Sequence, residues 1–246
     1  MAITFGSLFA GIGGFDLGFE RCGMQCKWQV EIDDYATKVL EKHWPHVARH
    51  RDIRQVGGHN LERVDIICGG FPCQDLSYAG LGAGLDGERS GLFFEAIRVV
   101  CELRPRFVVL ENVAALLTRG LDRVLGALAE VGFDAEWDCL PASAFGAHFR
   151  GDRIFIVASR AAASCLRWKR KWTNPSRAFA GNEFARLVEC ELQLCVSAGK
   201  GDRVSDGLSY RVDRLRGLGN SVVPQVAEWI GSRIVEVMQA EAPNAT

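Results

Sequence analysis

The segment Gly69–Ser77, with the sequence GGFPCQDLS, places Cys73 directly after Pro72 at the end of an apolar run. Pro72 fixes its own φ and pushes Phe71 into an extended conformation, so we expect Cys73 on a short, stiff turn just past a strand. A thiol in that position can act as a nucleophile when a nearby cation or an amide-rich turn stabilises the thiolate. The alternative is a small hydrophobic residue under a turn, because cysteine is often buried.

Two charged residues are expected near this cysteine because each adjoins an apolar strand. Glu111 follows the apolar run that ends at Leu110, and Arg153 opens the run Ile154–Ala158. In a partly dry pocket the Glu111 carboxyl can stay protonated and donate a hydrogen bond, and Arg153 can supply the positive charge that a thiolate needs. A solvated carboxylate and a surface ion pair, which is worth little, are the alternatives.

A glycine-rich turn follows the first apolar run of the chain. Gly11, Gly13 and Gly14 stand between a predicted strand and a predicted helix, where a doubly wound sheet binds nucleotide-like ligands. Glu31, at the end of the next predicted strand, is placed to accept hydrogen bonds from ribose hydroxyls. Asp16 stands at the third glycine position of G-x-G-x-x-G, which weakens the case for a dinucleotide. An ordinary tight turn and a surface carboxylate remain the alternative.

The scaffold for these residues is predicted from the hydrophobic pattern of residues 1–158. The predicted strands are Ile3–Leu8, Cys26–Ile32, Val64–Cys68, Arg106–Leu110, Ala135–Leu140 and Ile154–Ala158. The predicted helices are Phe15–Cys22, Tyr35–His43, Leu92–Leu103 and Leu121–Val131. Strands that are apolar throughout, in alternation with helices, indicate an open, mostly parallel α/β sheet with helices on both faces.

The pattern breaks after residue 158. Residues 159–215 are irregular, basic and aromatic, and we expect them to form a small separate module. Residues 216–246 contain an amphipathic helix that starts near Pro224 and is expected to return to the large domain. From Cys165 to Gly217 there are 11 Lys and Arg against 6 Asp and Glu, although the whole chain has a net charge of −1. This asymmetry indicates that the basic part meets a polyanion.

The composition excludes several classes of protein. The 246 residues are 48% hydrophobic, which is enough for a substantial core. No run approaches the roughly 18 apolar residues of a membrane span, and no signal peptide opens the chain, so we expect a cytoplasmic protein. The nine cysteines are scattered and do not indicate a disulfide scaffold. No paired C-x-x-C set occurs, and we expect no bound metal.

Six motifs occur along the chain in a fixed order. They are LFAGIGG at 8–14, Glu31, GGFPCQ at 69–74, ENV at 111–113, RIFIVA at 153–158 and GNSVVPQ at 219–225. Their order and spacing resemble the DNA (cytosine-5-)-methyltransferase family, bacterial and phage members above all, across nearly the whole chain. The resemblance implies a Rossmann-like methyltransferase fold, S-adenosylmethionine as cofactor, and double-stranded DNA as the partner of a monomeric enzyme in a bacterial cell or a phage-infected host.

The family's mechanism implies a role for each motif. Cys73 would add to carbon 6 of a flipped-out cytosine, Glu111 would bind N3 and the exocyclic amine, and Arg153 would hold the oxygen side of the ring. The implied cofactor-binding residues are Phe9, Gly11, Gly13, Glu31, Asp52 and Asn220. The implied DNA contacts are Ser77 and Arg89 in a glycine-rich loop, with Arg167, Lys169, Arg170 and Lys171 in the basic stretch 165–177.

Three features depart from the family pattern. Ser7 stands where an acidic residue usually precedes Leu-Phe-Ala-Gly. Phe149 and Gly151 replace residues of a Gln-x-Arg-x-Arg motif of which only Arg153 is in place, so a contact in the base pocket is altered. Target recognition normally comes from the region between the Arg153 and Asn220 motifs, and here it has only about fifty residues.

Other functions fit parts of the sequence. One branch of the family methylates cytosine in transfer RNA. A nicotinamide-dependent oxidoreductase would need the third glycine and gives no role to Phe-Pro-Cys-Gln, whereas an inactive DNA-binding module would fit the altered arginine motif. The sequence does not identify the recognised DNA site, and it leaves open whether a cognate restriction endonuclease accompanies the enzyme as part of a restriction-modification system.

Overall fold

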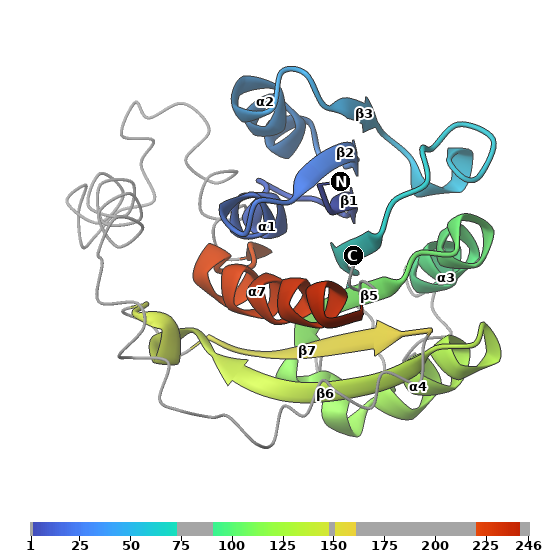
Figure 1. Ribbon diagram of the computed structural model, residues 1–246, viewed down its shortest axis with the longest axis vertical. Coiled ribbons are helices and arrows are strands. Elements are labelled where there is room, and N and C mark those ends of the chain that lie inside the picture. Colours follow the sequence, from blue (N-terminus) through green and yellow to red (C-terminus); the bar gives the residue numbers. More distant parts are fainter. Residues whose placement is uncertain (1, 73–90, 148–150, 161–219, 242–246) are drawn as a thin grey trace, which may run out of the picture.

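Strands and helices alternate along the chain in a computed structural model that describes residues 2–72, 91–147, 151–160 and 220–241 (Figure 1). The strands are β1 (Thr4–Leu8), β2 (Gln25–Val30), β3 (Ala48–His50), β4 (Ile66–Gly70), β5 (Phe107–Val113), β6 (Asp134–Pro141) and β7 (Asp152–Ser159). The α-helices are α1 (Gly14–Arg21), α2 (Asp34–His43), α3 (Gly91–Leu103), α4 (Leu121–Glu130) and α7 (Pro224–Glu241). Short 3-10 helices are η1 (Ile53–Gln55), η4 (Ala114–Thr118) and η5 (Ala142–Phe145).

The described strands form one sheet of seven in the order β3-β2-β1-β4-β5-β7-β6. The five strands from β3 to β5 are parallel, whereas β7 runs antiparallel to both β5 and β6. This confirms the predicted open, mostly parallel sheet. The antiparallel strand brings its first residues to the edge at which the parallel strands end, since Arg153 pairs with Val113 at the end of β5.

Side chains alternate between two apolar layers, one on each face of the sheet. Ile67 and Val108 belong to the core cluster that includes residues of α3 and α4. Ile66 and Val109 belong to the cluster that includes residues of α1 and α7. Both faces are therefore covered by helices, which explains why the central strands are apolar throughout.

Helix α7, at the C-terminal end of the described chain, packs closely against α1 near the N-terminus (Figure 1). A Cβ added at Gly18 would lie 2.5 Å from the Cβ of Ala227 and 2.5 Å from the carbonyl oxygen of Pro224, so glycine permits the close approach. The last helix thus completes the same hydrophobic layer that α1 begins.

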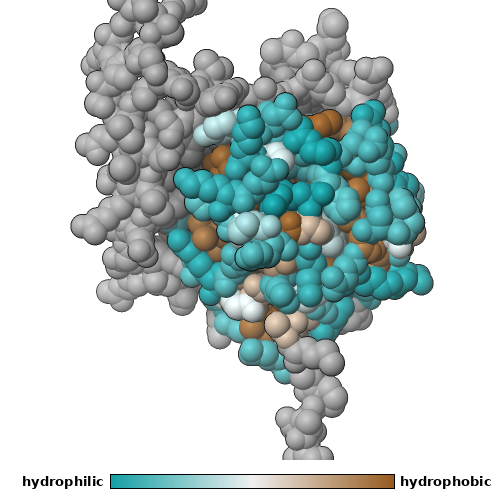
Figure 2. Space-filling view, turned by 90° about the horizontal axis from the view of Figure 1, so that it is seen from above, coloured by the Kyte–Doolittle hydropathy of each residue, from teal (hydrophilic) through white to brown (hydrophobic). Residues whose placement is uncertain are grey.

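Some bounds of the predicted elements were wrong. Strand β5 was predicted to end at Leu110 but runs to Val113, so Glu111 lies within the strand and not after it. Strand β2 ends at Val30, so Ile32 lies beyond the strand in which we predicted it and is 63% exposed. Strand β3 was missed, because three residues containing Arg49 and His50 carry no apolar alternation. Within the described residues, no helix is long and apolar enough to cross a membrane. On the face shown in Figure 2, hydrophobic residues are scattered among hydrophilic ones.

Candidate active site

A pocket of about 1140 Å³ opens where the parallel strands end. Its lining includes residues that follow β1, β2 and β3, together with the last residues of β4 and β5. Seven of the predicted site residues line it, namely Phe9, Gly11, Glu31, Asp52, Glu111, Arg153 and Asn220. This is the edge at which doubly wound sheets bind their ligands.

The glycine turn after β1 has an unusual backbone. Gly11 has φ +56 and Gly13 has φ +89, and Phe9 adopts φ 52 although it is not a glycine. Strained residues of this kind cluster at functional sites. Gly13 does not line the pocket; it precedes α1 as its N-cap, and an added Cβ there would lie 2.4 Å from the ring of Trp44.

The carboxylate of Glu31 joins two backbone segments around the pocket. One oxygen accepts the N–H of Gly11 at 2.7 Å, and the other accepts the N–H of Asp33 at 2.7 Å. Each carboxylate oxygen keeps a lone pair for a further donor. Ile32, next to this carboxylate, also lines the pocket, and our sequence analysis missed it. Its position in the sequence could have indicated this, because Ile32 is an apolar residue between Glu31 and the pair Asp33 and Asp34.

The departure at Ser7 is accompanied by a buried carboxyl group nearby. The Ser7 hydroxyl donates to Asp16 at 3.1 Å, and the Gln29 side-chain amide donates to the same carboxyl at 2.8 Å. Burial raises the pKa of Asp16, and these hydrogen bonds oppose the shift. The residue at the third glycine position is therefore a buried acid beneath the turn, held from β1 and β2.

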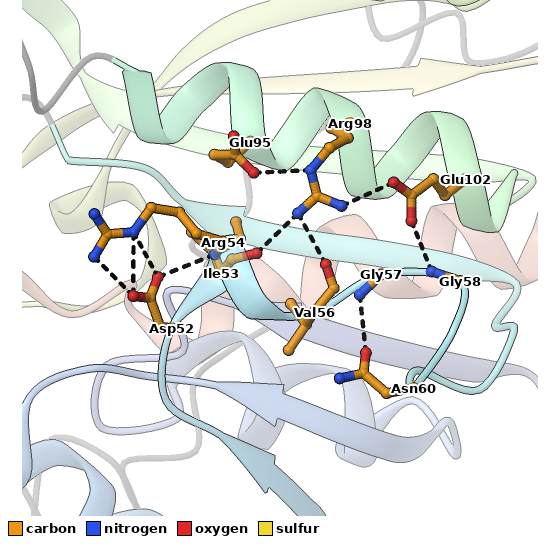
Figure 3. Close-up of polar contacts among 10 residues, drawn as sticks. All are labelled: Asp52, Ile53, Arg54, Val56, Gly57, Gly58, Asn60, Glu95, Arg98 and Glu102. Atoms are coloured by element: carbon orange, nitrogen blue, oxygen red, sulfur yellow. Dashed lines mark hydrogen bonds and ion pairs between the residues drawn. The ribbon is translucent and has the colours of Figure 1, made fainter.

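Asp52 lies at the pocket wall, where it precedes η1 as its N-cap. Its carboxylate accepts the backbone N–H of Arg54 at 3.0 Å and pairs with the Arg54 guanidinium, whose Nη2 lies 2.7 Å from Oδ2 (Figure 3). The hydrogen bonds from the Arg54 side chain and backbone lower the pKa of Asp52. This end of the pocket thus carries a stable negative charge.

Glu111 presents the opposite situation at the end of β5. It is 6% exposed, and burial raises its pKa to about 7, although the positive charge of Arg153 opposes the shift. The Nε of Arg153 lies 3.5 Å from Oε1 of Glu111. Gly70, its partner on β4, leaves room for the carboxyl, because an added Cβ would lie 2.7 Å from Oε2. Near neutral pH the carboxyl can therefore both donate and accept a proton.

The backbone that leads to Cys73 is fixed at the same place. Asn112 is 2% exposed, and its side-chain amide donates to the carbonyl oxygen of Phe71 at 3.1 Å. Phe71 and Pro72 both line the pocket. Cys73 lies outside the described residues, but the chain reaches the pocket next to Glu111 just before it. Asn112 was not among the predicted site residues, although it lies in the ENV motif.

The remaining predicted residues lie outside the described part of the chain. These are Ser77, Arg89, Arg167, Lys169, Arg170 and Lys171, and also Phe149 of the altered arginine motif. Gly151 of that motif is described and has φ +47, a conformation that favours glycine over arginine. In the described ranges no group of three or more His, Cys, Asp or Glu could hold a metal ion.

The family model for C-5 cytosine-specific DNA methylases matches residues 3–189. The chain belongs to this family. It is 34% identical over 162 residues to the Type II methyltransferase M.HhaI of Haemophilus parahaemolyticus, covering 64% of this chain and 49% of that protein. It is also 34% identical over 159 residues to M.BsuFI of Bacillus subtilis, covering 63% and 39%. The chain thus spans about half the length, or less, of these curated relatives.

Solved structures agree with the fold. A mutant of DNMT2 from Spodoptera frugiperda superimposes with a TM-score of 0.66 at 16% identity, covering 97% of this chain and 100% of that chain. A DNA modification methyltransferase encoded within an Escherichia coli prophage superimposes with a TM-score of 0.56 at 24% identity, covering 66% and 48%. At these identities the likeness concerns the Rossmann-like methyltransferase fold alone.

Proposed function

We propose that this chain transfers a methyl group from S-adenosylmethionine to carbon 5 of a flipped-out cytosine in a specific duplex DNA sequence, through a covalent adduct with Cys73. One observation carries the proposal. The buried Glu111 carboxyl, with its pKa raised to about 7, lines the pocket beside Arg153 and beside the Phe71–Pro72 backbone. An acid with this pKa, next to the segment that bears the cysteine, suits chemistry in which negative charge develops on a cytosine ring.

The other half of the pocket fits the cofactor. The Glu31 carboxylate is held by two backbone N–H groups and can still accept from ribose hydroxyls. Asp52 offers an anionic acceptor for the amine of adenine, and Ile32 offers an exposed apolar side chain for its ring. Asn220 lines the pocket just before α7, and Gly11 and Gly13 shape the turn. When bound, S-adenosylmethionine supplies a methyl group on a sulfonium centre.

The protein supplies the nucleophile and the proton. The Cys73 thiolate forms a bond to carbon 6 of cytosine, and the electron pair of the C5–C6 double bond becomes available at carbon 5. Glu111, in its protonated form, donates to N3 and stabilises the added electron density. Arg153 holds the oxygen side of the ring and favours the thiolate. After methyl transfer, carbon 5 loses its proton to water and the bond between sulfur and carbon 6 breaks with its electron pair on sulfur, which releases the Cys73 thiolate. N3 returns its proton to Glu111, and 5-methylcytosine leaves with both protein groups in their starting forms.

A cytosine stacked in a duplex cannot reach this pocket, so the base must flip out. We assign DNA contact to Ser77 and Arg89, and to the basic residues Arg167, Lys169, Arg170 and Lys171, because lysine and arginine bind phosphates and arginine also reads guanine edges. Residues 1–158 then form the catalytic domain, 159–215 the target-recognition region and 216–246 the returning segment. The packing of α7 on α1 supports this division.

The test is methyl transfer with a labelled methyl donor, using duplex DNA or transfer RNA as acceptor. We expect label in DNA, recovered as 5-methylcytosine after hydrolysis to nucleosides. Label in RNA alone would mean that the substrate is RNA and not DNA. DNA that the protein shifts in a gel-mobility assay but does not label would indicate an inactive binding module. Bisulfite sequencing of DNA from cells that express the chain would then identify the methylated sequence.

A further inference from the structure

The segment from Asp52 to Asn60 begins at the pocket wall and has little regular structure apart from η1. Its backbone is bound by side chains of α3, above all by Arg98 (Figure 3). The Nη2 of Arg98 donates to the carbonyl oxygen of Ile53 at 3.0 Å and to that of Val56 at 2.8 Å. One guanidinium thus joins both ends of η1.

Arg98 is itself held in a single orientation by two acids of its own helix (Figure 3). Its Nε donates to Glu95 at 2.8 Å, and its Nη1 donates to Glu102 at 2.8 Å. The second oxygen of Glu102 accepts the backbone N–H of Gly58 at 2.8 Å. Helix α3 therefore binds the segment at three backbone groups. Only the planar fork of arginine offers donors in these directions, because a lysine has a single nitrogen.

Of the three residues bound in this way, Ile53 lines the pocket, and Asp52 directly precedes Ile53 as the N-cap of η1. Asp52 also lines the pocket, and Ile53 is 4% exposed in the core next to α3. We propose that Arg98 is a positioning residue for the adenine end of the pocket: by fixing η1 it aims the Asp52 carboxylate at the exocyclic amine of the cofactor. The inference rests on the proposed function. It assigns to Arg98 the selection of adenine over a base that carries an oxygen at the same position.

The chain offers a matched pair of glycines to test this. An added Cβ at Gly57 would lie 2.2 Å from Oε2 of Glu102 and 3.0 Å from Nη1 of Arg98, whereas at Gly58 the nearest atom is 3.7 Å away. Neither glycine has a positive φ. Gly57→Ala therefore pushes the flexible ends of these two side chains apart, and Gly58→Ala leaves them in place while adding the same methyl group.

The experiment measures calorimetric dissociation constants for S-adenosylhomocysteine and S-inosylhomocysteine, whose base carries an oxygen in place of the amine. We expect the wild-type chain to bind the adenosyl compound at least about tenfold more tightly, because a hydrogen bond to a charged acceptor is replaced by repulsion. In Arg98→Gln this ratio should fall to about threefold or less, through loss of adenosyl affinity. Gly57→Ala should give an intermediate ratio, and Gly58→Ala the wild-type ratio.

The ratio of the two dissociation constants within one variant distinguishes a positioning role from partial unfolding. Partial unfolding weakens the binding of both ligands by the same factor and leaves the ratio unchanged. Wild-type ratios in both Arg98→Gln and Gly57→Ala would overturn the role of Arg98 while leaving the cofactor assignment intact. A wild-type chain that binds neither compound would overturn the proposed function, and the role of Arg98 with it. The two failures are therefore distinguishable.

Discussion

Two carboxyl groups in the same pocket differ in their environment. Asp52 stands on a short connection after β3, where the Arg54 guanidinium and backbone N–H hold its pKa below the usual value. Glu111 stands inside a strand flanked on both sides by other strands, and burial raises its pKa to about 7 against the charge of Arg153. At neutral pH one end of the pocket thus carries an anion, and the other carries an acid that titrates near that pH.

The difference teaches how one sheet edge supports two tasks. A charged acceptor suits the binding of a ligand that does not change its protonation. A carboxyl near its pKa suits a reacting base, since it can supply a proton at neutral pH. The two ends are separated in the chain, so variants can act on one end and leave the other unchanged.

The largest effect is expected from Cys73→Ser, which removes the proposed nucleophile. Methyl transfer should fall by at least about 1000-fold, because the covalent step depends on a thiolate and the serine hydroxyl is a much weaker nucleophile. The dissociation constant for S-adenosylhomocysteine should stay within about twofold of the wild-type value, since the binding end is untouched. Steady-state assays measure the loss of methyl transfer, and calorimetry measures the cofactor affinity. Covalent trapping of the protein by 5-fluorocytosine DNA should also be lost. Unchanged activity would end the thiolate mechanism.

The next largest effect is expected from Glu111→Gln, which keeps the size of the side chain and removes its proton exchange. The turnover number should fall by about 100-fold, as is usual for loss of a general acid. In the wild-type chain, kcat/KM for DNA should decline as the pH rises through about 7, because Glu111 loses its proton. Stopped-assay rates between pH 6 and pH 9 check this, and a glutamine variant whose profile keeps the same decline would assign that titration to another group.

Although Glu111→Gln should lower the turnover number, it should raise the free energy of unfolding above neutral pH. Between the ordinary glutamate pKa of about 4.5 and the folded value of about 7, the folded state binds more protons than the unfolded state, so stability falls as the pH rises. Glu111→Gln lacks this loss and should be more stable than the wild type above pH 7, by roughly 3 kcal/mol. The difference should vanish near pH 4. Urea unfolding at both pH values measures it, and equal stability at pH 8 would contradict the buried-acid assignment.

Much of this architecture follows from the sequence, for a physical reason. The central strands are covered on both faces, so they must be apolar throughout, and their ends can be predicted from the residues that break the run. Glu111 breaks the apolar run of β5, although the strand itself continues to Val113. The expected approach of Arg153 to Glu111 depends on β7 being antiparallel, because a residue that opens a parallel strand would lie at the opposite edge.

Other parts of the site have no local signal. Arg98 lies on the polar face of a regular helix with Glu95 and Glu102, and its partners in the loop are backbone carbonyls, which any sequence would provide. The pKa of Glu111 depends on burial among strands that are distant in the chain, which raises it, and on the charge of Arg153, which lowers it. The sequence predicted the position of the Glu111 carboxyl and left open whether it lies in a dry pocket or in solvent. The structure shows that it is buried.

A smaller effect is expected from Glu31→Gln at the binding end. A glutamine has one acceptor oxygen where Glu31 uses two, so one of the N–H groups of Gly11 and Asp33 would face an amide donor. Affinity for S-adenosylhomocysteine should fall by about tenfold, and the turnover number at saturating cofactor should change little. Measuring KM and kcat separately tests this. A variant that loses turnover at saturation while keeping its affinity would show that the two ends of the pocket are not independent.

The smallest effect is expected from Arg54→Gln, which removes the cation beside Asp52. The pair is solvent-facing, with the Arg54 side chain 63% exposed, and such ion pairs contribute little. At pH 7 Asp52 stays ionised with or without Arg54, so affinity for S-adenosylhomocysteine should change by less than about threefold. Because Arg54 lowers the pKa of Asp52, the variant should begin to lose affinity at a higher pH than the wild type on acidification. Calorimetry between pH 7 and pH 4 measures the onset. Coincident curves would mean that Asp52 does not contact the ligand. The difference in pKa between Asp52 and Glu111 would then not reflect separate roles in binding and catalysis.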